Sequence, residues 1–305
     1  MKTPPPDRSS IDTEKRNPHS SKLHKLSVEE CVQLIHEEDL AIHRAMDQAA
    51  RAMSAFLVDA SPRFCQGGRL IYFGAGTSGR LGVLDASEAP PTFQVDPGRV
   101  VGIIAGGDGA LRKSSEGKED DPSGVIPELQ NLKLQSNDIV IGIAAGGTTP
   151  YVRGGLAWAA NLKSSPLTAF ITCSDISSPN GVAHRIFLET GPEVVTGSTR
   201  MKAGTATKLC LNTISTTLMI QEGRVYGNLM VDVKASNDKL MDRAARILTT
   251  LTGLQRDKAF ETLEDCDGHL KTALVSIHLS CTKEEAEKKL KSFPLAHWLE
   301  KESSN

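Results

Sequence analysis

The stretch that decides the fold is Gly68–Phe93, GRLIYFGAGTSGRLGVLDASEAPPTF. It begins with the apolar run Leu70–Phe73, breaks into the glycine-rich loop Gly74–Gly79 and continues with a helical pattern. Glycines let a backbone turn sharply and approach a ligand closely. A helix start leaves free N–H groups that attract an anion. The stretch therefore predicts a ligand-binding strand–loop–helix unit of an α/β protein.

Further apolar runs follow this unit and predict the remaining strands. They are Val100–Ala105, Ile139–Ala144, Leu167–Thr172 and Arg185–Leu188. Strands that are apolar throughout and separated by helical segments are typical of a parallel sheet covered on both faces. We therefore predict a doubly wound parallel sheet, with ligands bound beyond the carboxyl ends of its strands.

The composition changes twice along the chain and predicts three parts. Residues 1–22 are rich in Pro, Ser and charge, which favours a flexible arm. Residues 23–250 hold the predicted sheet and open with a helix that Ser27 and Glu30 cap. Residues 251–305 contain short, charged, amphipathic helices and predict a small helical module.

Charge and composition exclude several classes of protein. A formal net charge of −2 over 305 residues gives no reason to expect a nucleic acid or an anionic membrane as partner. No apolar run approaches the roughly 20 residues that span a bilayer, and no signal peptide is evident, so we expect a cytoplasmic protein. The six cysteines and eight histidines show no CxxC or HxxxH spacing. We therefore expect free thiols and no metal site.

The glycine loop carries hydroxyl and basic side chains that suit a phosphate monoester. The predicted phosphate-binding residues are Gly76, Thr77, Ser78, Gly79 and Arg80. The same loop also matches the weak dinucleotide pattern G-x-G-x-x-G, with Asp96 near the place of a ribose-binding acid. A purely structural turn is a third interpretation. The hydroxyls and the arginine favour a phosphosugar.

A second hydroxyl-rich and basic helix start lies at 196–202, TGSTRMK. Ser198, Arg200 and Lys202 are further candidates for anion binding. The same residues could equally well serve only to cap the helix. Composition leaves these two interpretations open.

Two glutamates are candidates for acid–base chemistry. Glu88 lies on the helix after the glycine loop, and we expect Pro90 and Pro91 to end that helix just beyond it. Glu119 belongs to an acidic run that follows the second strand's loop, as Glu88 follows the first. Read singly, each is a solvated surface carboxylate. Flanking one sugar, the pair supplies a base and an acid.

Long motifs identify the family that this chain resembles. The strings GAGTSGRLGVLDASEAPPTF, EGKEDD and GPEVVTGSTRMKAGTATKLCLN resemble the N-acetylmuramic acid 6-phosphate etherases. That family belongs to the sugar isomerase (SIS) domain superfamily, which also contains the glucokinase regulatory protein. The match runs from about residue 12 to the C-terminus and includes TEKRNP in the arm. The resemblance implies an SIS fold, a homodimer, no cofactor, and a C-terminal module similar to a ubiquitin-associated fold.

The resemblance also implies an activity and its residues. The family cleaves the D-lactyl ether of N-acetylmuramic acid 6-phosphate, with Glu88 as the acid and Glu119 as the base. The chain departs from the family at 144–151, where it reads AAGGTTPY instead of AASGRTPY. The expected binding residues there are Gly147, Thr148 and Thr149. Because a serine and an arginine are missing, a non-catalytic phosphosugar sensor is the alternative, and a phosphosugar isomerase is a third.

Overall fold

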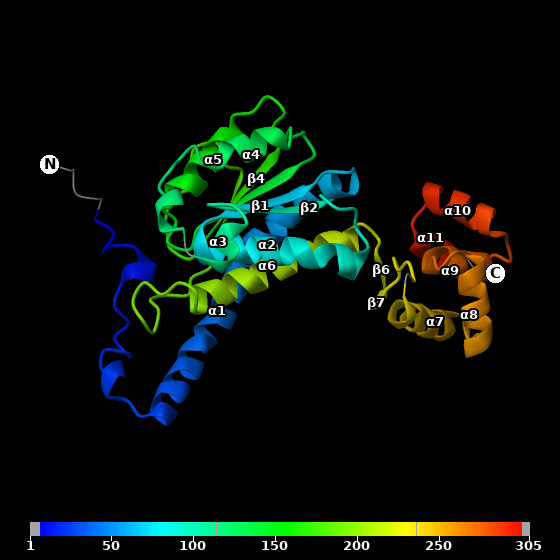
Figure 1. The fold of residues 1–305 in the computed structure, drawn as a ribbon, viewed down its shortest axis with the longest axis horizontal. Helices are drawn as coiled ribbons and strands as arrows, with labels where there is room; N and C mark the ends of the chain where they lie inside the picture. Colours follow the sequence, from blue (N-terminus) through cyan, green and yellow to red (C-terminus); the bar gives the residue numbers. More distant parts are fainter. Residues whose placement is uncertain (1–6, 114, 236, 301–305) are drawn as a thin grey trace. The chain divides into compact units, whose positions relative to one another are not determined.

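The computed structural model describes residues 7–113, 115–235 and 237–300. The chain divides into two compact units, one of Met1–Glu88 with Pro97–Leu218 and one of Ala89–Asp96 with Met219–Asn305. The first unit contains the sheet, and the second contains the C-terminal helices (Figure 1).

A five-stranded sheet forms the centre of the first unit. Its strands are β1 Leu70–Gly74, β2 Val100–Ile104, β3 Ile139–Ile143, β4 Leu167–Thr172 and β5 His184–Phe187. They are all parallel and lie in the order β2-β1-β3-β4-β5. Leu70 pairs with both Val100 and Ile139. The strand order therefore reverses between β1 and β3, where ligands bind in sheets of this kind.

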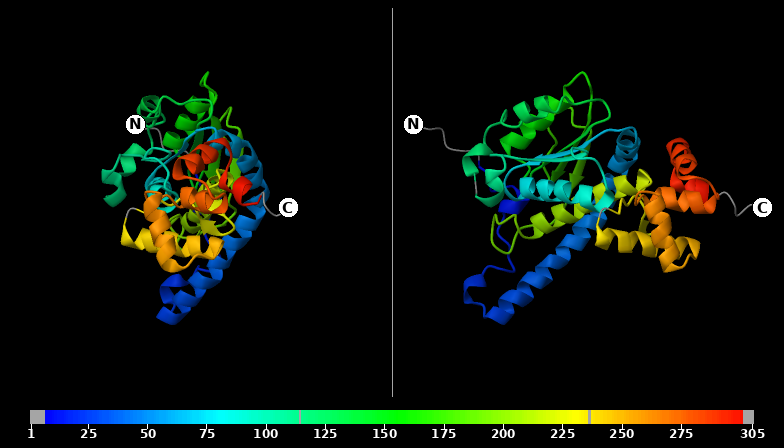
Figure 2. Two further views of the ribbon diagram at one scale, coloured as in Figure 1. Left: turned by 90° about the vertical axis from the view of Figure 1, so that its right-hand side faces the viewer. Right: turned by 45° about the vertical axis from the view of Figure 1, so that its right-hand side comes forward.

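Helices cover both faces of this sheet (Figures 1 and 2). They are α1 Val28–Cys65, α2 Gly76–Phe93, α3 Gly109–Arg112, α4 Ile126–Asn131, α5 Pro150–Ala160 and α6 Lys202–Gln221, with three short 3-10 helices at Asp12–Glu14, Leu23–Lys25 and Glu116–Lys118. On one face, α4 and α5 pack on a core that includes Phe73 and Phe170. Neighbouring strand side chains alternate between faces, so Tyr72 points to the opposite face, toward α2. The predicted doubly wound α/β fold is confirmed.

The start of α1 is capped as predicted. Glu30 N–H donates to Ser27 Oγ (3.2 Å), and Ser27 N–H donates to the Glu30 carboxylate (2.7 Å). This capping box satisfies two of the N–H groups that a helix start leaves open.

The predicted end of α2 is wrong. The helix continues through Pro90 and Pro91 to Phe93, so Glu88 lies more than a turn before its end. The two prolines have no N–H to donate to the preceding turn. The last turn is closed instead by Gln94, whose N–H donates to Pro90 O (2.9 Å). Gln94 adopts a left-handed backbone with φ 53°, a common way to terminate a helix.

The arm before α1 packs against the first unit at several points. Its composition favours flexibility, yet Ile11, Thr13 and Asn17 are buried. Thr13 N–H donates to Ser174 Oγ (3.4 Å), and Gly197 N–H donates to Thr13 O (3.2 Å). These three buried residues are separated by charged residues and show no periodic pattern. Composition alone therefore does not reveal that the arm packs here.

The second unit is helical with one short hairpin. Its helices are α7 Asp238–Thr252, α8 Arg256–Asp265, α9 Leu270–His278, α10 Lys283–Ser292 and α11 Leu295–Leu299, and its hairpin pairs β6 Val225–Tyr226 with β7 Leu229–Met230. Ala244, Leu263 and Leu274 belong to one apolar core that α7, α8 and α9 share. The predicted module 251–305 stays a prediction.

All six cysteines are free, as the sequence predicts. Across the described ranges, no helix is both long enough and apolar enough to cross a bilayer.

Candidate functional site

A cavity of about 210 Å³ lies at the carboxyl ends of β1 and β3, where the strand order reverses. Five segments line it: the arm, the loop between β1 and α2, the segment between β2 and α4 that carries Glu119, the loop between β3 and α5, and the loop before α6. Its lining residues are Arg8, Ile11, Glu14, Ala75, Gly76, Thr77, Ser78, Glu119, Ile143, Ala144, Ala145, Gly146, Thr148, Thr149, Gly197 and Thr199. We call it the loop cavity.

The start of α2 forms one wall of the loop cavity. Gly76 has φ +52°, a left-handed conformation that favours glycine. A Cβ on Gly79 would lie 2.5 Å from Gly74 O, so only glycine lets α2 begin directly behind β1. Among the described residues, no side chain accepts a hydrogen bond from the first N–H groups of α2. These groups therefore offer the loop cavity a ready site for an anion.

The charges of the loop cavity suit a phosphorylated sugar between two carboxylates. Arg8 is the cation among its lining residues, and Glu14 and Glu119 are the carboxylates. The hydroxyls of Thr77 and Ser78 lie beside the helix start. A phosphate can thus be held by N–H groups, hydroxyls and one guanidinium. The sugar would then lie next to groups that accept and donate protons.

Two of the predicted binding residues have other contacts. Arg80 donates to Ala110 O (2.7 Å) and Leu111 O (3.2 Å), which fixes the loop after β2. Gly147 does not line the loop cavity. Its left-handed φ of +76° and its close approach to Thr172 indicate a turn-forming role.

The second hydroxyl-rich helix start is closed by a buried carboxylate. Glu193 is fully buried and accepts from the N–H groups of Lys202 (3.0 Å) and Ala203 (2.9 Å), at the start of α6. Burial raises the pKa of Glu193, although these two hydrogen bonds and the charge of Lys202 oppose the shift. The start of α6 therefore already holds an anion, a carboxylate from the chain itself.

The basic side chains of this segment are directed elsewhere. Lys202 Nζ donates to Glu38 (2.5 Å) and is almost fully buried. Burial raises the pKa of Glu38, but contacts with Lys202, His19 and Asn17 outweigh it and hold this pKa below its usual value. Ser198 and Arg200 do not line the loop cavity, whereas their neighbours Gly197 and Thr199 do.

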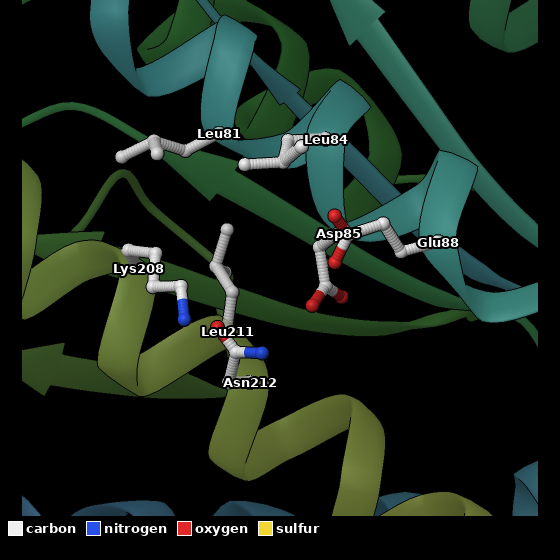
Figure 3. A pocket seen from close by; sticks show the side chains of 7 residues that line it. All are labelled: Leu81, Leu84, Asp85, Glu88, Lys208, Leu211 and Asn212. Carbon is white, nitrogen blue, oxygen red and sulfur yellow. The ribbon is translucent and has the colours of Figure 1, made fainter. Parts of the chain in front are cut away.

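Glu88 does not line the loop cavity in this chain. It lies in a separate hollow between α2 and α6, with a volume of about 10 Å³ (Figure 3). The lining residues are Leu81, Leu84, Asp85, Glu88, Lys208, Leu211 and Asn212. We call this the α2–α6 hollow. A space of this size holds about one water.

Asp85 stabilises the wall of the α2–α6 hollow. It accepts from Tyr72 OH (2.9 Å) and from Ser215 Oγ (3.1 Å), so it joins α2 to β1 and α6. Burial raises the pKa of Asp85, and the neighbouring Glu88 adds to the shift. The two hydrogen bonds and the charge of Lys208 act in the opposite direction.

A further cavity of about 420 Å³ lies beside the segment that carries Glu119. It is lined by Gly106, Gly107, Lys118, Asp121, Gly124, Glu128 and Tyr151. Tyr151 N–H donates to Glu119 O (3.0 Å), which ties this segment to the start of α5. The α2 loop does not line this cavity, so it lacks the anion-binding helix start.

Arg8 and Glu14 are the charged lining residues that sequence reasoning did not assign to the site. Both belong to the arm, whose composition favours a loose segment. The motif Thr13–Pro18 in this arm was the available signal. Glu14 packs against Gly197, where an added Cβ would lie 3.2 Å from its carboxylate.

The donor chemistry of the site offers no obvious place for a metal. In the part of the chain that the structure describes, no three His, Cys, Asp or Glu side chains gather as metal ligands would.

Comparisons with known proteins give close relatives over most of the chain. The family model of the glucokinase regulatory protein N-terminal SIS domain matches residues 48–160. An N-acetylmuramic acid 6-phosphate etherase of Synechococcus sp. (strain CC9902) is 47% identical over 283 residues, which cover 93% of this chain and 89% of the relative. One from Gloeobacter violaceus is 50% identical over 271 residues, 88% of each chain. One from Lactobacillus acidophilus is 45% identical over 93% of this chain and 95% of the relative.

Solved structures add a weaker likeness. The sugar isomerase domain of an RpiR transcription factor from Sphaerobacter thermophilus is 17% identical, with a TM-score of 0.42. It covers 63% of this chain and 92% of that one. A likeness at this level carries no argument about function.

Proposed function

Because the chain belongs to the N-acetylmuramic acid 6-phosphate etherase family, we propose that it cleaves the D-lactyl ether of N-acetylmuramic acid 6-phosphate. The products are N-acetylglucosamine 6-phosphate and D-lactate. The reaction consumes one water and needs no redox step. It is a lyase reaction followed by hydration.

The chemistry of the open-chain sugar explains why two carboxylates suffice. The C1 aldehyde acidifies the C2 proton, so a carboxylate base removes it and the electron pair is held as an enolate. When the enolate collapses, C2 and C3 form a double bond, the C3–O bond breaks, and an acid protonates the departing lactate oxygen. Water then adds at C3, and C2 regains a proton. General acid and base assistance contributes roughly 10²- to 10⁴-fold each.

One observation carries the proposal: Glu119 lines the same cavity as the open helix start of α2. A phosphate on the N–H groups and hydroxyls at Gly76–Ser78 would leave the sugar beside Glu119. We therefore assign Glu119 as the C2 base. Following its family motif, we assign Glu88 as the acid that protonates lactate.

The remaining binding residues follow from the same cavity. We propose that Thr77, Ser78, Thr148 and Thr149 bind the phosphate and the sugar hydroxyls, with Arg8 as the neutralising cation. We assign no contact with substrate to Arg80, Arg200 or Lys202.

The wider setting also belongs to this proposal. We propose a cytoplasmic homodimer that binds a small phosphosugar and neither nucleic acid nor membrane. Residues 23–250 would carry the catalytic site, and residues 251–305 would form a separate helical module. The formal net charge of −2 supports only the part of this proposal that leaves out nucleic acid and an anionic membrane as partners.

The test measures two rates for the wild type, Glu119→Gln and Glu88→Gln. The first is D-lactate release from N-acetylmuramic acid 6-phosphate, and the second is exchange of the C2 proton with deuterium from solvent. We expect Glu119→Gln to lose both. We expect Glu88→Gln to lose lactate release and keep exchange, because proton removal precedes departure of lactate.

Glu128→Gln is the matched control, since Glu128 is an exposed glutamate outside the loop cavity. It should keep both rates. A folded wild type that releases no lactate would contradict the etherase and favour the sensor. The reported relatives, all named as etherases, do not favour that alternative.

A further inference from the structure

The first unit contains a second large cavity that has no part in the proposed reaction. It measures about 420 Å³, against about 210 Å³ for the loop cavity. Its lining residues are Gly106, Gly107, Lys118, Asp121, Gly124, Glu128 and Tyr151, and we call it the Tyr151 cavity. Small-molecule sites usually measure roughly 300–1,000 Å³. The Tyr151 cavity is therefore large enough for an organic ligand.

One buried polar group on the wall of the Tyr151 cavity is unsatisfied. Tyr151 is 2% exposed, and its hydroxyl has no hydrogen-bond partner among the residues that the structure describes. Its ring belongs to the apolar core and meets Phe73 edge to face, with 6.3 Å between the ring centroids. A phenylalanine would make the same core contacts without burying an unpaired donor, which is costly. The hydroxyl therefore calls for a partner from outside the chain.

Two other lining residues flank the Tyr151 ring. A Cβ added to Gly124 would lie 3.0 Å from Tyr151 Cδ2 and 3.2 Å from its Cε2. Burial raises the pKa of Tyr151, and the negative charge of Glu128 raises this pKa further, so the carboxylate acts on the hydroxyl. The two groups form no hydrogen bond with each other. A ligand group that joins them must accept from the phenol and donate to the carboxylate, as an alcohol hydroxyl does.

The charged lining residues favour an uncharged ligand with several hydroxyls. Lys118 donates hydrogen bonds, whereas Asp121 and Glu128 accept them. Lys118 and Glu128 are exposed, and across the described ranges neither side chain forms a hydrogen bond or an ion pair, so both can change rotamer when a ligand enters. Two carboxylates against one ammonium group disfavour a phosphate. A cationic amine cannot accept the hydrogen bonds that Lys118 and the phenol donate.

We propose that the Tyr151 cavity is a second binding site of this chain and that it takes an uncharged sugar. The hydroxyls of a sugar ring both donate and accept, so they match the mixed donors and acceptors of the lining. The site adjoins the segment that carries Glu119, because Lys118 and Asp121 flank this residue closely in sequence and Tyr151 N–H donates to Glu119 O (3.0 Å). This proposal concerns binding without turnover and does not rest on the proposed function.

The experiment titrates the full chain with N-acetylglucosamine, which carries no phosphate, and follows binding by ligand-observed NMR. We expect saturable binding with a Kd on the order of 1 mM for a ligand of this size. Tyr151→Phe should raise the Kd about 2- to 10-fold, the effect of one lost hydrogen bond. Its midpoint of urea denaturation without sugar should not fall, because the variant removes a buried donor that has no partner.

Tyr226→Phe is the matched control, since Tyr226 does not line the Tyr151 cavity, and it should leave the Kd unchanged. The proposal would be overturned by a wild type that does not bind the sugar, or by a Tyr151→Phe variant with the wild-type Kd. Displacement of the sugar by inorganic phosphate would also overturn it, because the sugar would then occupy the loop cavity. A wild type that binds the sugar as expected but releases no lactate would support this site and contradict only the proposed function.

Discussion

The starts of α2 and α6 look alike in sequence and differ in structure. Each follows a segment rich in Gly, Ser and Thr, and each has an arginine close by, Arg80 or Arg200. The start of α2 lines the loop cavity, whereas that of α6 is occupied by the buried carboxylate of Glu193. A helix start binds an external anion only when the fold has not already supplied one. A residue outside the motif therefore decides its function.

The largest expected effect comes from placing a carboxylate at the open start. Ser78→Asp should raise KM for N-acetylmuramic acid 6-phosphate on the order of 10- to 100-fold, as expected when a hydrogen bond to a charged group is lost. The negative charge of the new aspartate repels the phosphate of the substrate. The rise in KM would be measured from the steady-state kinetics of lactate release.

Ser198→Asp is the matched control at the closed start. It adds the same charge before α6 but outside the residues that line the loop cavity. KM should change by less than about twofold. Equal effects of the two substitutions would contradict the distinction between the open and closed starts.

Removing the internal anion is expected to affect stability. Glu193→Ala leaves the buried N–H groups of Lys202 and Ala203 without their acceptor. The cost should be about 1–3 kcal/mol in the free energy of unfolding, measured by urea denaturation. Glu189→Ala, an exposed glutamate nearby, should stay within about 0.5 kcal/mol of the wild type. An unchanged free energy of unfolding for Glu193→Ala would show that the start of α6 does not need the Glu193 carboxylate.

The strands illustrate what local patterns determine. Short apolar runs predict all five strands within one or two residues, most clearly β1, β3 and β4, which are buried at every position and lie inside the sheet. The sharp turn between β1 and α2 is also predictable from local residues, because its backbone requires glycine at Gly76 and Gly79. That this turn binds phosphate stays a prediction.

Where the structure differs from the sequence-based prediction of the site, the cause is a contact between residues distant in the chain. Lys202 resembles a phosphate ligand until Glu38, 164 positions away, is placed beside it. Glu14 reaches the loop cavity because buried Thr13 anchors the arm beside Ser174. Neither contact leaves a periodic or compositional signal. The end of α2 at Phe93 was mispredicted for another reason, because Pro90 and Pro91 usually stop a helix and here do not.

A smaller effect on KM is expected when the serine that the family has at position 146 is restored to the loop cavity. A Cβ on Gly146 would lie 3.4 Å from Thr13 Oγ1, an ordinary contact distance. Gly146→Ser should therefore fold and should lower KM by about 2- to 10-fold, the net value of one hydrogen bond. Gly109→Ser, at a glycine with open space around it, should leave KM unchanged. An unchanged KM for Gly146→Ser would show that this hydroxyl does not contact the substrate, and a higher KM would show that the added side chain obstructs it.

The smallest effect concerns the pH dependence of stability at the closed start. The pKa of Glu193 is raised above its ordinary 4.5, so its ionisation costs stability as pH rises from 4.5 through the folded-state value. The pKa of Glu38 is lowered, so its contribution is lost as pH falls below 4.5. Urea denaturation from about pH 3 to about pH 7 should separate the two. Relative to wild type, Glu193→Gln should gain stability as pH rises above 4.5, and Glu38→Gln as pH falls below it. If both variants gained stability in the same direction of pH change, the opposite pKa shifts of Glu193 and Glu38 would be wrong.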